Sequence, residues 1–244
     1  MTQTSVPVIF DLDGTLVDPA GGITGGIAAA LSEMGLPVPD QDILESMVGP
    51  KLSDSLGTIA GVPAELVDEA ITRYRAHYLA TGIAAGRLYP GIHGLLDYFS
   101  AAGRPVAVAT QKPQGLARVV LEHHGIDGFF AAICGSSDDE SAGALTAAGG
   151  TVPSGKVEIV AAALAALDAQ CAVMVGDRHQ DVAGALANGL DCIGVRWGFA
   201  PDGELEDAGA VAVVDSADEL RKKIEELDVV RAAALSEVQN DGSL

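Results

Sequence analysis

The sequence predicts an α/β fold in which a parallel sheet, covered by helices on both faces, carries an all-helical insertion after its first strand. Three observations predict it. Strand-like apolar runs alternate with amphipathic helical patterns over residues 87–230. Residues 19–86 hold only helical patterns, broken by Gly and Pro. Polar residues follow three of the apolar runs, at the strand ends where α/β sheets bind ligands.

Length and charge limit the classes of function. The chain has 244 residues, 48% of them hydrophobic, which is enough for a large core domain with a smaller insert. A formal charge of −20 argues against a nucleic-acid polymer or an anionic membrane as partner. No apolar run is long enough to span a membrane, and residues 1–7 have no basic region and leave no room for a signal sequence. We therefore expect a cytoplasmic protein, either a monomer or a homodimer.

The first strand-like run, residues 6–10, ends in Asp11, Asp13, Gly14 and Thr15. Strand alternation places the two carboxylates on one side. An unpaired carboxylate at the end of a buried strand is costly unless it faces a cation or a reacting group. Gly14 allows a turn, and Thr15 offers a hydroxyl and an amide to an anion. Taken alone, the same motif is also typical of a polar turn that simply ends a strand.

We predict that residues 1–18 and 87–230 form the core domain, residues 19–86 a mobile cap, and residues 231–244 a flexible tail. In the cap, the longest helix is expected at Ala64–Ala80. Lys51 lies in a turn between cap helices, where it either reaches the anionic end of a substrate or is a solvated loop lysine. Glycines flank the cap and are expected to act as hinges: Gly21, Gly22, Gly25, Gly26, Gly82 and Gly86.

The core elements follow in order after the cap. The helix before the second strand contains Ile92, Leu95, Leu96 and Phe99. The later strands are expected at Val106–Ala109, Ala131–Cys134, Ala172–Val175, Cys192–Val195 and Val211–Val214. The helices between and after them are expected at Gln114–His124, Val157–Leu167, Asp181–Asn188 and Ala217–Leu227.

Polar residues also follow the later strands of the core. Thr110 and Gln111 bring a hydroxyl and amides to a helix start, which suits a phosphate oxygen or an ordinary helix cap. Asp177 follows an apolar strand and a glycine, and with Asp11 and Asp13 it would form an all-oxygen site for Mg²⁺. Asp181 is placed close to this site, but it also suits the N-cap of its helix.

Lys156 opens a helix, where a cation opposes the helix dipole. Its position therefore indicates a phosphate or carboxylate partner.

The ordered set Asp11-x-Asp13-Gly14-Thr15, Thr110, Lys156 and Gly176-Asp177 with Asp181 resembles the haloacid dehalogenase superfamily of hydrolases. The resemblance implies a Rossmann-like core, a helical cap between the first two motifs, a Mg²⁺ cofactor and an aspartyl-phosphate intermediate. It further implies these roles: Asp11 as nucleophile, Asp13 as general acid and base, Asp11, Asp177 and the Asp13 carbonyl as metal ligands, Asp181 as a nearby carboxylate, and Gly14, Thr15, Thr110, Gln111 and Lys156 as phosphate ligands.

Within this superfamily the chain looks most similar to phosphoglycolate-phosphatase-like members with a helical cap. The resemblance implies a phosphatase that acts on a small phosphorylated metabolite, such as a phosphoglycolate-like compound or a nucleotide. A phosphomutase and a catalytically silent binding protein on the same fold are the alternatives. Two features depart from the family pattern: Gln111 stands where Asn or Ser is more usual, and the segment 136–155 is long, suggesting a surface loop or a flap near the substrate.

Overall fold

The computed structural model describes residues 5–137 and 155–241. The expectation for the segment 136–155 therefore lies outside the described residues, except at its two ends. Within the described ranges, no helix is both long and apolar enough to cross a membrane.

The core is a six-stranded sheet in the order β5-β4-β1-β6-β7-β8, and every neighbouring pair is parallel. This confirms the predicted α/β fold. The predicted strands agree with the structure to within two residues at each end, except that the second runs four residues further, to Pro113. The six strands are β1 (Val8–Phe10), β4 (Val106–Pro113), β5 (Ala132–Ser136), β6 (Val173–Gly176), β7 (Asp191–Val195) and β8 (Ala212–Val214).

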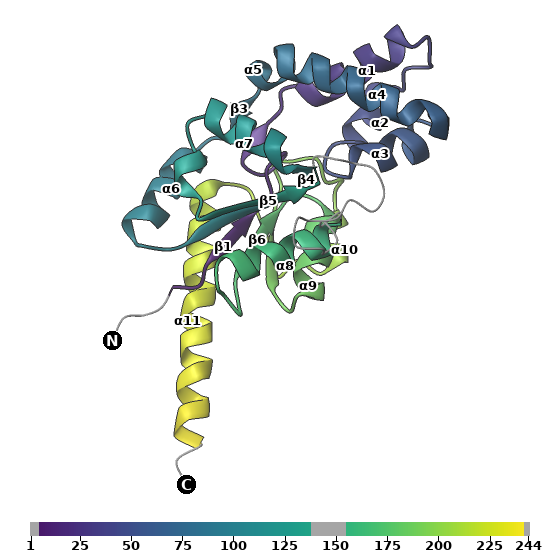
Figure 1. Ribbon diagram of the computed structural model, residues 1–244. Helices are drawn as coiled ribbons and strands as arrows, with labels where there is room; N and C mark the ends of the chain where they lie inside the picture. Colours follow the sequence, from purple (N-terminus) through teal and green to yellow (C-terminus); the bar gives the residue numbers. More distant parts are fainter. Residues whose placement is uncertain (1–4, 138–154, 242–244) are drawn as a thin grey trace.

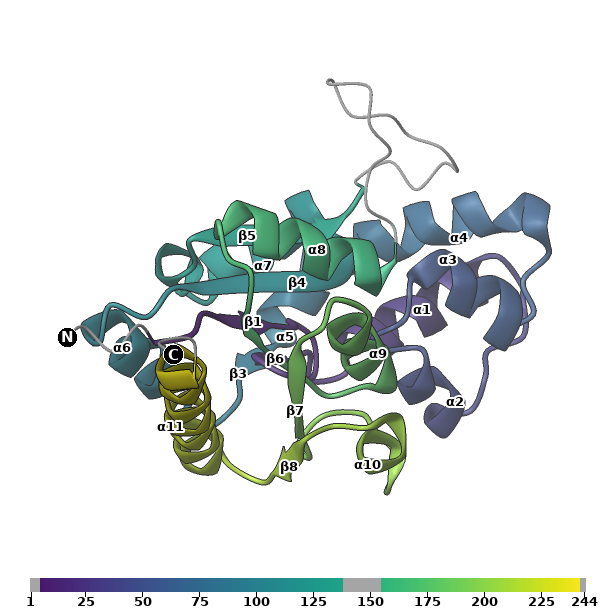
Figure 2. The same ribbon diagram turned by 90° about the horizontal axis from the view of Figure 1, so that it is seen from below.

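Helices cover both faces of the sheet (Figures 1 and 2). Because side chains alternate along a strand, Ile9 faces one helical layer while Val8 and Phe10 face the other. The layer on Ile9 consists of α8 (Lys156–Ala166), α9 (His179–Ala187) and α10 (Glu204–Ala208). The opposite layer consists of α6 (Ile92–Ala101), α7 (Gln114–His123) and α11 (Ala217–Asp241).

The last helix is longer than predicted. We expected it to end at Leu227, but α11 continues to Asp241 and projects beyond the rest of the molecule (Figure 1). The sequence explains the extension, because no Gly or Pro follows within the helix before Gly242. Arg231 ties the extension to the core through an ion pair of 2.7 Å with Asp191.

A short antiparallel pair joins the core to the inserted helices. It consists of β2 (Val17–Asp18) and β3 (Arg87–Leu88), which the sequence patterns did not predict because each strand has only two residues. The insert contains α1 (Gly22–Glu33), α2 (Gln41–Ser46), α3 (Leu52–Asp54), α4 (Ala64–His77), α5 (Ile83–Ala85) and two π-helical turns, η1 (Ser55–Ile59) and η2 (Tyr78–Gly82).

Two of the glycines expected as hinges pack against each other. A Cβ atom built on Gly22 would lie 2.4 Å from the carbonyl oxygen of Gly82, so the backbones of α1 and η2 approach too closely for a side chain. Gly26 similarly faces the Tyr74 ring, with its virtual Cβ 3.2 Å away. These glycines therefore allow close packing within the cap. Hinge motion at the other glycines that flank the cap remains a prediction.

Candidate active site

Three central strands bring the predicted motifs together. β1 lies between β4 and β6, and all three run parallel, so their carboxyl ends share one edge of the sheet. Asp11 directly follows β1, and its N–H donates to Val175 O at 2.9 Å. Thr110 lies within β4, and Asp177 directly follows β6. Motifs that are far apart in the sequence therefore lie close together in the structure.

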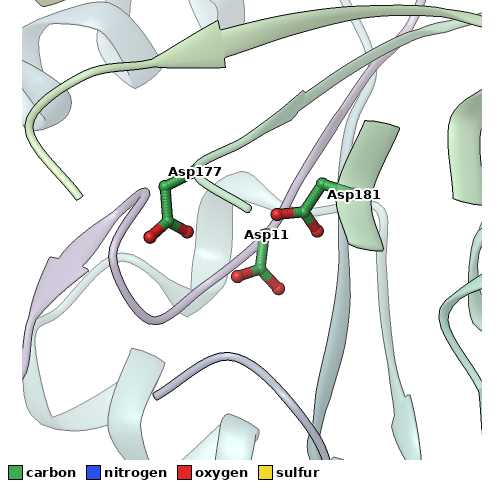
Figure 3. Close-up of side chains that lie close together, drawn as sticks. All are labelled: Asp11, Asp177 and Asp181. Atoms are coloured by element: carbon green, nitrogen blue, oxygen red, sulfur yellow. The ribbon is translucent and has the colours of Figure 1, made fainter. Parts of the chain in front are cut away.

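A carboxylate cluster, defined here as Asp11, Asp177 and Asp181, forms the centre of the site (Figure 3). One oxygen from each residue lies within 4.8 Å of the others, and all three residues are buried. We predicted side-chain ligands from Asp11 and Asp177, with Asp13 contributing its carbonyl. The structure adds the Asp181 carboxylate, which was expected only near the site, whereas the Asp13 side chain lies outside the cluster.

Lys156 is the cation within this cluster. Its Nζ lies 2.6 Å from Asp11 Oδ1 and 2.7 Å from Asp181 Oδ1, and it also donates to Ala109 O at 2.8 Å. Burial alone would lower the pKa of Lys156, but the two carboxylates raise it, so the side chain stays charged. The anionic partner predicted for Lys156 is therefore a pair of carboxylates of the same chain, Asp11 and Asp181.

The cluster carries more negative than positive charge. Burial raises the pKa of Asp11 to about 7. Lys156 lowers this pKa, whereas the negative charges of Asp181 and Asp13 raise it further. Burial raises the pKa of Asp177 well above its ordinary value, and repulsion from the Asp181 and Asp11 carboxylates adds to this effect. Within the described ranges, the hydrogen-bond donors to Asp177 are neutral: Thr15 Oγ1 at 3.2 Å and Phe199 N at 2.8 Å. A hard divalent cation suits this donor set because it would neutralise the excess charge.

Two glycines let the surrounding loops close on Asp177. Gly14 has φ +86°, and a Cβ on it would lie 2.1 Å from Asp177 Oδ2. A Cβ on Gly198 would lie 2.3 Å from Asp177 Cβ. Thr15 directs its hydroxyl to Asp177, and its carbonyl accepts a hydrogen bond of 3.1 Å from Trp197 Nε1. Gly14 and Thr15 thus help to position Asp177, and their phosphate-binding role stays a prediction.

Asp13 pairs with a lysine that sequence reasoning missed. Lys112 Nζ lies 2.8 Å from Asp13 Oδ2, and both side chains are buried. Lys112 N–H donates to Thr110 Oγ1 at 3.2 Å, so the hydroxyl expected to bind phosphate also accepts a hydrogen bond within β4. The available signal was the position of Lys112 two residues after Thr110, on the same face of an extended segment.

A cavity lies between this edge of the sheet and the cap. From the core it is lined by Asp11, Asp13, Thr110, Gln111, Lys112, Pro113 and Leu116, and from the cap by Ile23, Met47, Val48, Gly49, Pro50, Leu52, Tyr74 and Arg75. Gln111 Oε1 is buried without a hydrogen-bond partner among the described residues. Lys51 is not among the lining residues, although Gly49, Pro50 and Leu52 are.

Arg178 connects the carboxylate cluster to the cap, a role that the sequence patterns did not indicate. Its main-chain N–H donates to Asp181 Oδ2 at 3.1 Å. Its NH1 group donates to Val48 O of the cap at 2.7 Å, and its Nε pairs with Glu204 at 2.9 Å. Gly49 accommodates this contact, since a Cβ there would lie 3.1 Å from Arg178 Cγ.

The raised pKa of Asp11 predicts how stability depends on pH and metal. A carboxyl group whose pKa rises to about 7 on folding stabilises the fold while protonated, so metal-free protein should lose stability as pH rises from about 4 to 7. Mg²⁺ at a hundredfold excess over its dissociation constant should raise the Tm by about 5–10 °C at pH 8. The increase should be smaller at pH 5.5, where protons compete. Thermal unfolding at both pH values measures this; equal Mg²⁺ effects at both would contradict it.

Comparison with known proteins identifies relatives over most of the chain. The model of the haloacid dehalogenase-like hydrolase family matches residues 8–195. The tyrosine-protein kinase PtkA of Mycobacterium tuberculosis is 40% identical over 221 residues, covering 89% of this chain and 72% of that protein. A 5'-nucleotidase of Pseudomonas aeruginosa is 37% identical, covering 81% of this chain and 86% of that protein.

A phosphoglycolate phosphatase of Rhodospirillum rubrum is 31% identical, covering 85% of this chain and 86% of that protein. A crystal structure of a predicted phosphatase from Clostridium acetobutylicum superposes with a TM-score of 0.81 at 38% identity, covering 91% of this chain and 99% of that one. These matches confirm the resemblance inferred from the motifs. The chain belongs to the haloacid dehalogenase-like hydrolase family.

Proposed function

We propose that the protein is a Mg²⁺-dependent phosphomonoester hydrolase that acts on a small phosphorylated metabolite through an aspartyl-phosphate. The observation that carries the proposal is the position of Asp11. Its carboxylate lies beside Lys156 and two further carboxylates, and it lines the cavity beneath the cap. A nucleophile that lines the cavity is therefore in contact with a buried cation and belongs to a carboxylate cluster that could hold a divalent metal.

The roles of the chain's own residues follow from this arrangement. A bound Mg²⁺ would be held by Asp11, Asp177 and Asp181, and it would supply charge neutralisation for the phosphate and the nucleophile. Asp11 Oδ attacks phosphorus, and the bond from phosphorus to the ester oxygen breaks. Thr110 lines the cavity from β4 and binds a phosphate oxygen, and Lys156, whose Nζ lies 2.6 Å from Asp11, offsets the charge of the phosphate.

Asp13 completes the reaction. It gives a proton to the departing oxygen and then takes one from the water that attacks phosphorus, which frees Asp11 and releases inorganic phosphate. Asp13 Oδ1 is buried without a hydrogen-bond partner among the described residues and its side chain lines the cavity. This oxygen therefore suits a contact with the ester oxygen or the water.

The relatives support a small phosphorylated substrate, because two of them are named as a 5'-nucleotidase and a phosphoglycolate phosphatase. The test is phosphate release from a panel of nucleoside monophosphates, phosphorylated acids and sugar phosphates, with Mg²⁺ and with EDTA. The proposal predicts metal-dependent release from at least one class. Absence of release across the panel would contradict it and would favour a catalytically silent binding protein.

A second candidate function is phosphoryl transfer to tyrosine, favoured by the 40% identity to PtkA over 89% of this chain. This function and a phosphomutase differ from the hydrolase in the acceptor, which would be a tyrosine or a second substrate hydroxyl instead of water. Incubation with labelled ATP and a tyrosine peptide tests the first alternative. Isomer analysis of sugar monophosphates tests the second. Phosphoryl transfer to either acceptor that is faster than phosphate release would contradict the hydrolase proposal.

A further inference from the structure

We propose that Arg178 is a positioning residue that holds the cap closed over the active site. The inference rests on the proposed hydrolase function, because closure serves the reaction only if the cavity beneath the cap holds a phosphate ester. Arg178 directly follows Asp177 in the chain. It does not line the cavity and does not belong to the carboxylate cluster, so its effect on the reaction runs through the cap.

The main chain of Arg178 is fixed to the carboxylate cluster. Its N–H donates to Asp181 Oδ2 at 3.1 Å, in the turn that joins β6 to α9. The whole residue is only 6% exposed, which is unusual for an arginine. A buried guanidinium group needs acceptors for its five N–H donors. The position of those acceptors shows what the side chain does.

The acceptors lie on both sides of the boundary between core and cap. NH1 donates to Val48 O at 2.7 Å and to Ser46 O at 3.5 Å. Both carbonyls lie at or just beyond the C-terminal end of α2, where a cation is favoured and carbonyls lack partners within the helix. Nε donates to Glu204 Oε1 of α10 at 2.9 Å. Arg178 therefore joins a helix end of the cap to two parts of the core.

Glu204 orients the guanidinium group from the core side. Its Oε1 also accepts a hydrogen bond of 2.9 Å from His179 N. Burial alone would raise the pKa of Glu204, but the hydrogen bonds from Arg178 and His179 outweigh burial and lower it. Glu204 is therefore ionised at neutral pH and holds Nε, while NH1 of the same group reaches the cap.

The cap segment that Arg178 contacts forms part of the wall of the cavity. Met47, Val48, Gly49 and Pro50 all line the cavity beneath the cap. Gly49 adopts φ +104°, and a Cβ there would lie 3.1 Å from Arg178 Cγ, so the segment turns closely around the arginine. Movement of residues 46–50 away from Arg178 would open this wall.

The contact can break and re-form because it lies beside an open groove between cap and core. The groove is lined by Arg178 itself, by Asp42, Glu45 and Ser46 of the cap and by Trp197, Phe199 and Pro201 of the core, among others. Water in such a groove can replace the bonds to the carbonyls when the cap opens. A hydrogen bond from a charged donor changes an equilibrium constant by about 10- to 100-fold. This is enough to decide between an open and a closed cap.

Amide hydrogen exchange tests the contact without any substrate. In Arg178→Met, peptides that cover residues 46–51 should exchange at least about tenfold faster than in the wild type, while peptides from β1 and β6 keep their rates. Arg196→Met is the matched control, because Arg196 also pairs with a glutamate of α10, Glu206, at 2.9 Å, and its other ion pair is with Asp215 of the core. Exchange of residues 46–51 at the wild-type rate in Arg178→Met would overturn the proposal.

Glu204→Gln tests the same idea if Arg178→Met folds poorly. It leaves Arg178 and the cap unchanged and weakens only the bond that orients the guanidinium group. Exchange of residues 46–51 should again be faster than in the wild type, by a smaller factor than in Arg178→Met. Exchange at the wild-type rate in this variant would also count against the proposal.

Kinetics shows whether closure serves the reaction. A cap that closes less often lowers the reacting fraction of the enzyme–substrate complex. Arg178→Met should therefore lower kcat at least about tenfold for the best panel substrate, while KM changes by less than about threefold. Arg178→Lys keeps one charged donor and should recover part of kcat. A raised KM with unchanged kcat would overturn the proposal, because Arg178 would then shape the binding cavity. If the wild type hydrolyses no substrate, the hydrolase function fails, while hydrogen exchange still decides whether Arg178 holds the cap.

Discussion

Replacement of Asp11 by asparagine is expected to abolish phosphate release, with a loss of several orders of magnitude in kcat. An amide is a poor nucleophile toward phosphorus, and the substitution also removes one carboxylate from the metal site. The fold should survive, because burial raises the pKa of Asp11 to about 7 and its ionised form is a cost to the folded state. Single-turnover kinetics with the best panel substrate measures the loss.

Asp97→Asn is the matched control for this variant. It makes the same chemical change on the exposed surface of α6, where Asp97 pairs with His93, and its activity should equal that of the wild type. Turnover by Asp11→Asn near the wild-type rate would show that another group attacks phosphorus.

Replacement of Asp177 by alanine is expected to weaken Mg²⁺ binding and to reduce activity together. Asp177 is fully buried, belongs to the carboxylate cluster and is held by neutral donors, so its charge is balanced mainly when a cation is present. Loss of one carboxylate ligand should weaken Mg²⁺ binding by about tenfold or more. Calorimetric titration with Mg²⁺ measures this directly.

A second variant at this position, Asp177→Asn, separates a metal effect from misfolding through its stability. Without metal, Asp177→Asn should be at least as stable as the wild type at pH 8, because it removes a buried charge whose pKa is raised by burial and by neighbouring carboxylates. Mg²⁺ should raise the Tm of the wild type by clearly more than it raises the Tm of Asp177→Asn. An unchanged Mg²⁺ affinity would place Asp177 outside the metal site.

The sequence predicted the parts of the site that lie next to strands. Asp11, Asp13 and Asp177 lie within three residues of the ends of apolar runs, and parallel strands end at one edge, so their proximity followed from the order of elements. The same reasoning recovered the sheet and its helices, because each is long enough to show a period. It could not detect β2 and β3, which have two residues each.

Contacts between distant segments were the parts that sequence could not predict. The pairing of Lys112 with Asp13 depends on how the end of β4 packs against the loop after β1. The bond from Arg178 to Val48 crosses from core to cap and joins residues 130 positions apart. The position of Lys112 two residues after Thr110 places it near the site, but no pattern in the sequence shows which partner it or Arg178 contacts. The extension of α11 was a different kind of error, since helix propensity alone favoured it.

Trapping the covalent intermediate tests the central claim most directly. Borohydride reduces an acyl phosphate to an alcohol, so rapid quenching during turnover with substrate and Mg²⁺ should convert the phosphorylated aspartate into homoserine. Peptide mapping by mass spectrometry should find this product at position 11, and it should be missing when substrate or Mg²⁺ is left out. Reduction at another carboxylate, or sustained phosphate release with Asp11 unmodified at every quench time, would contradict the account.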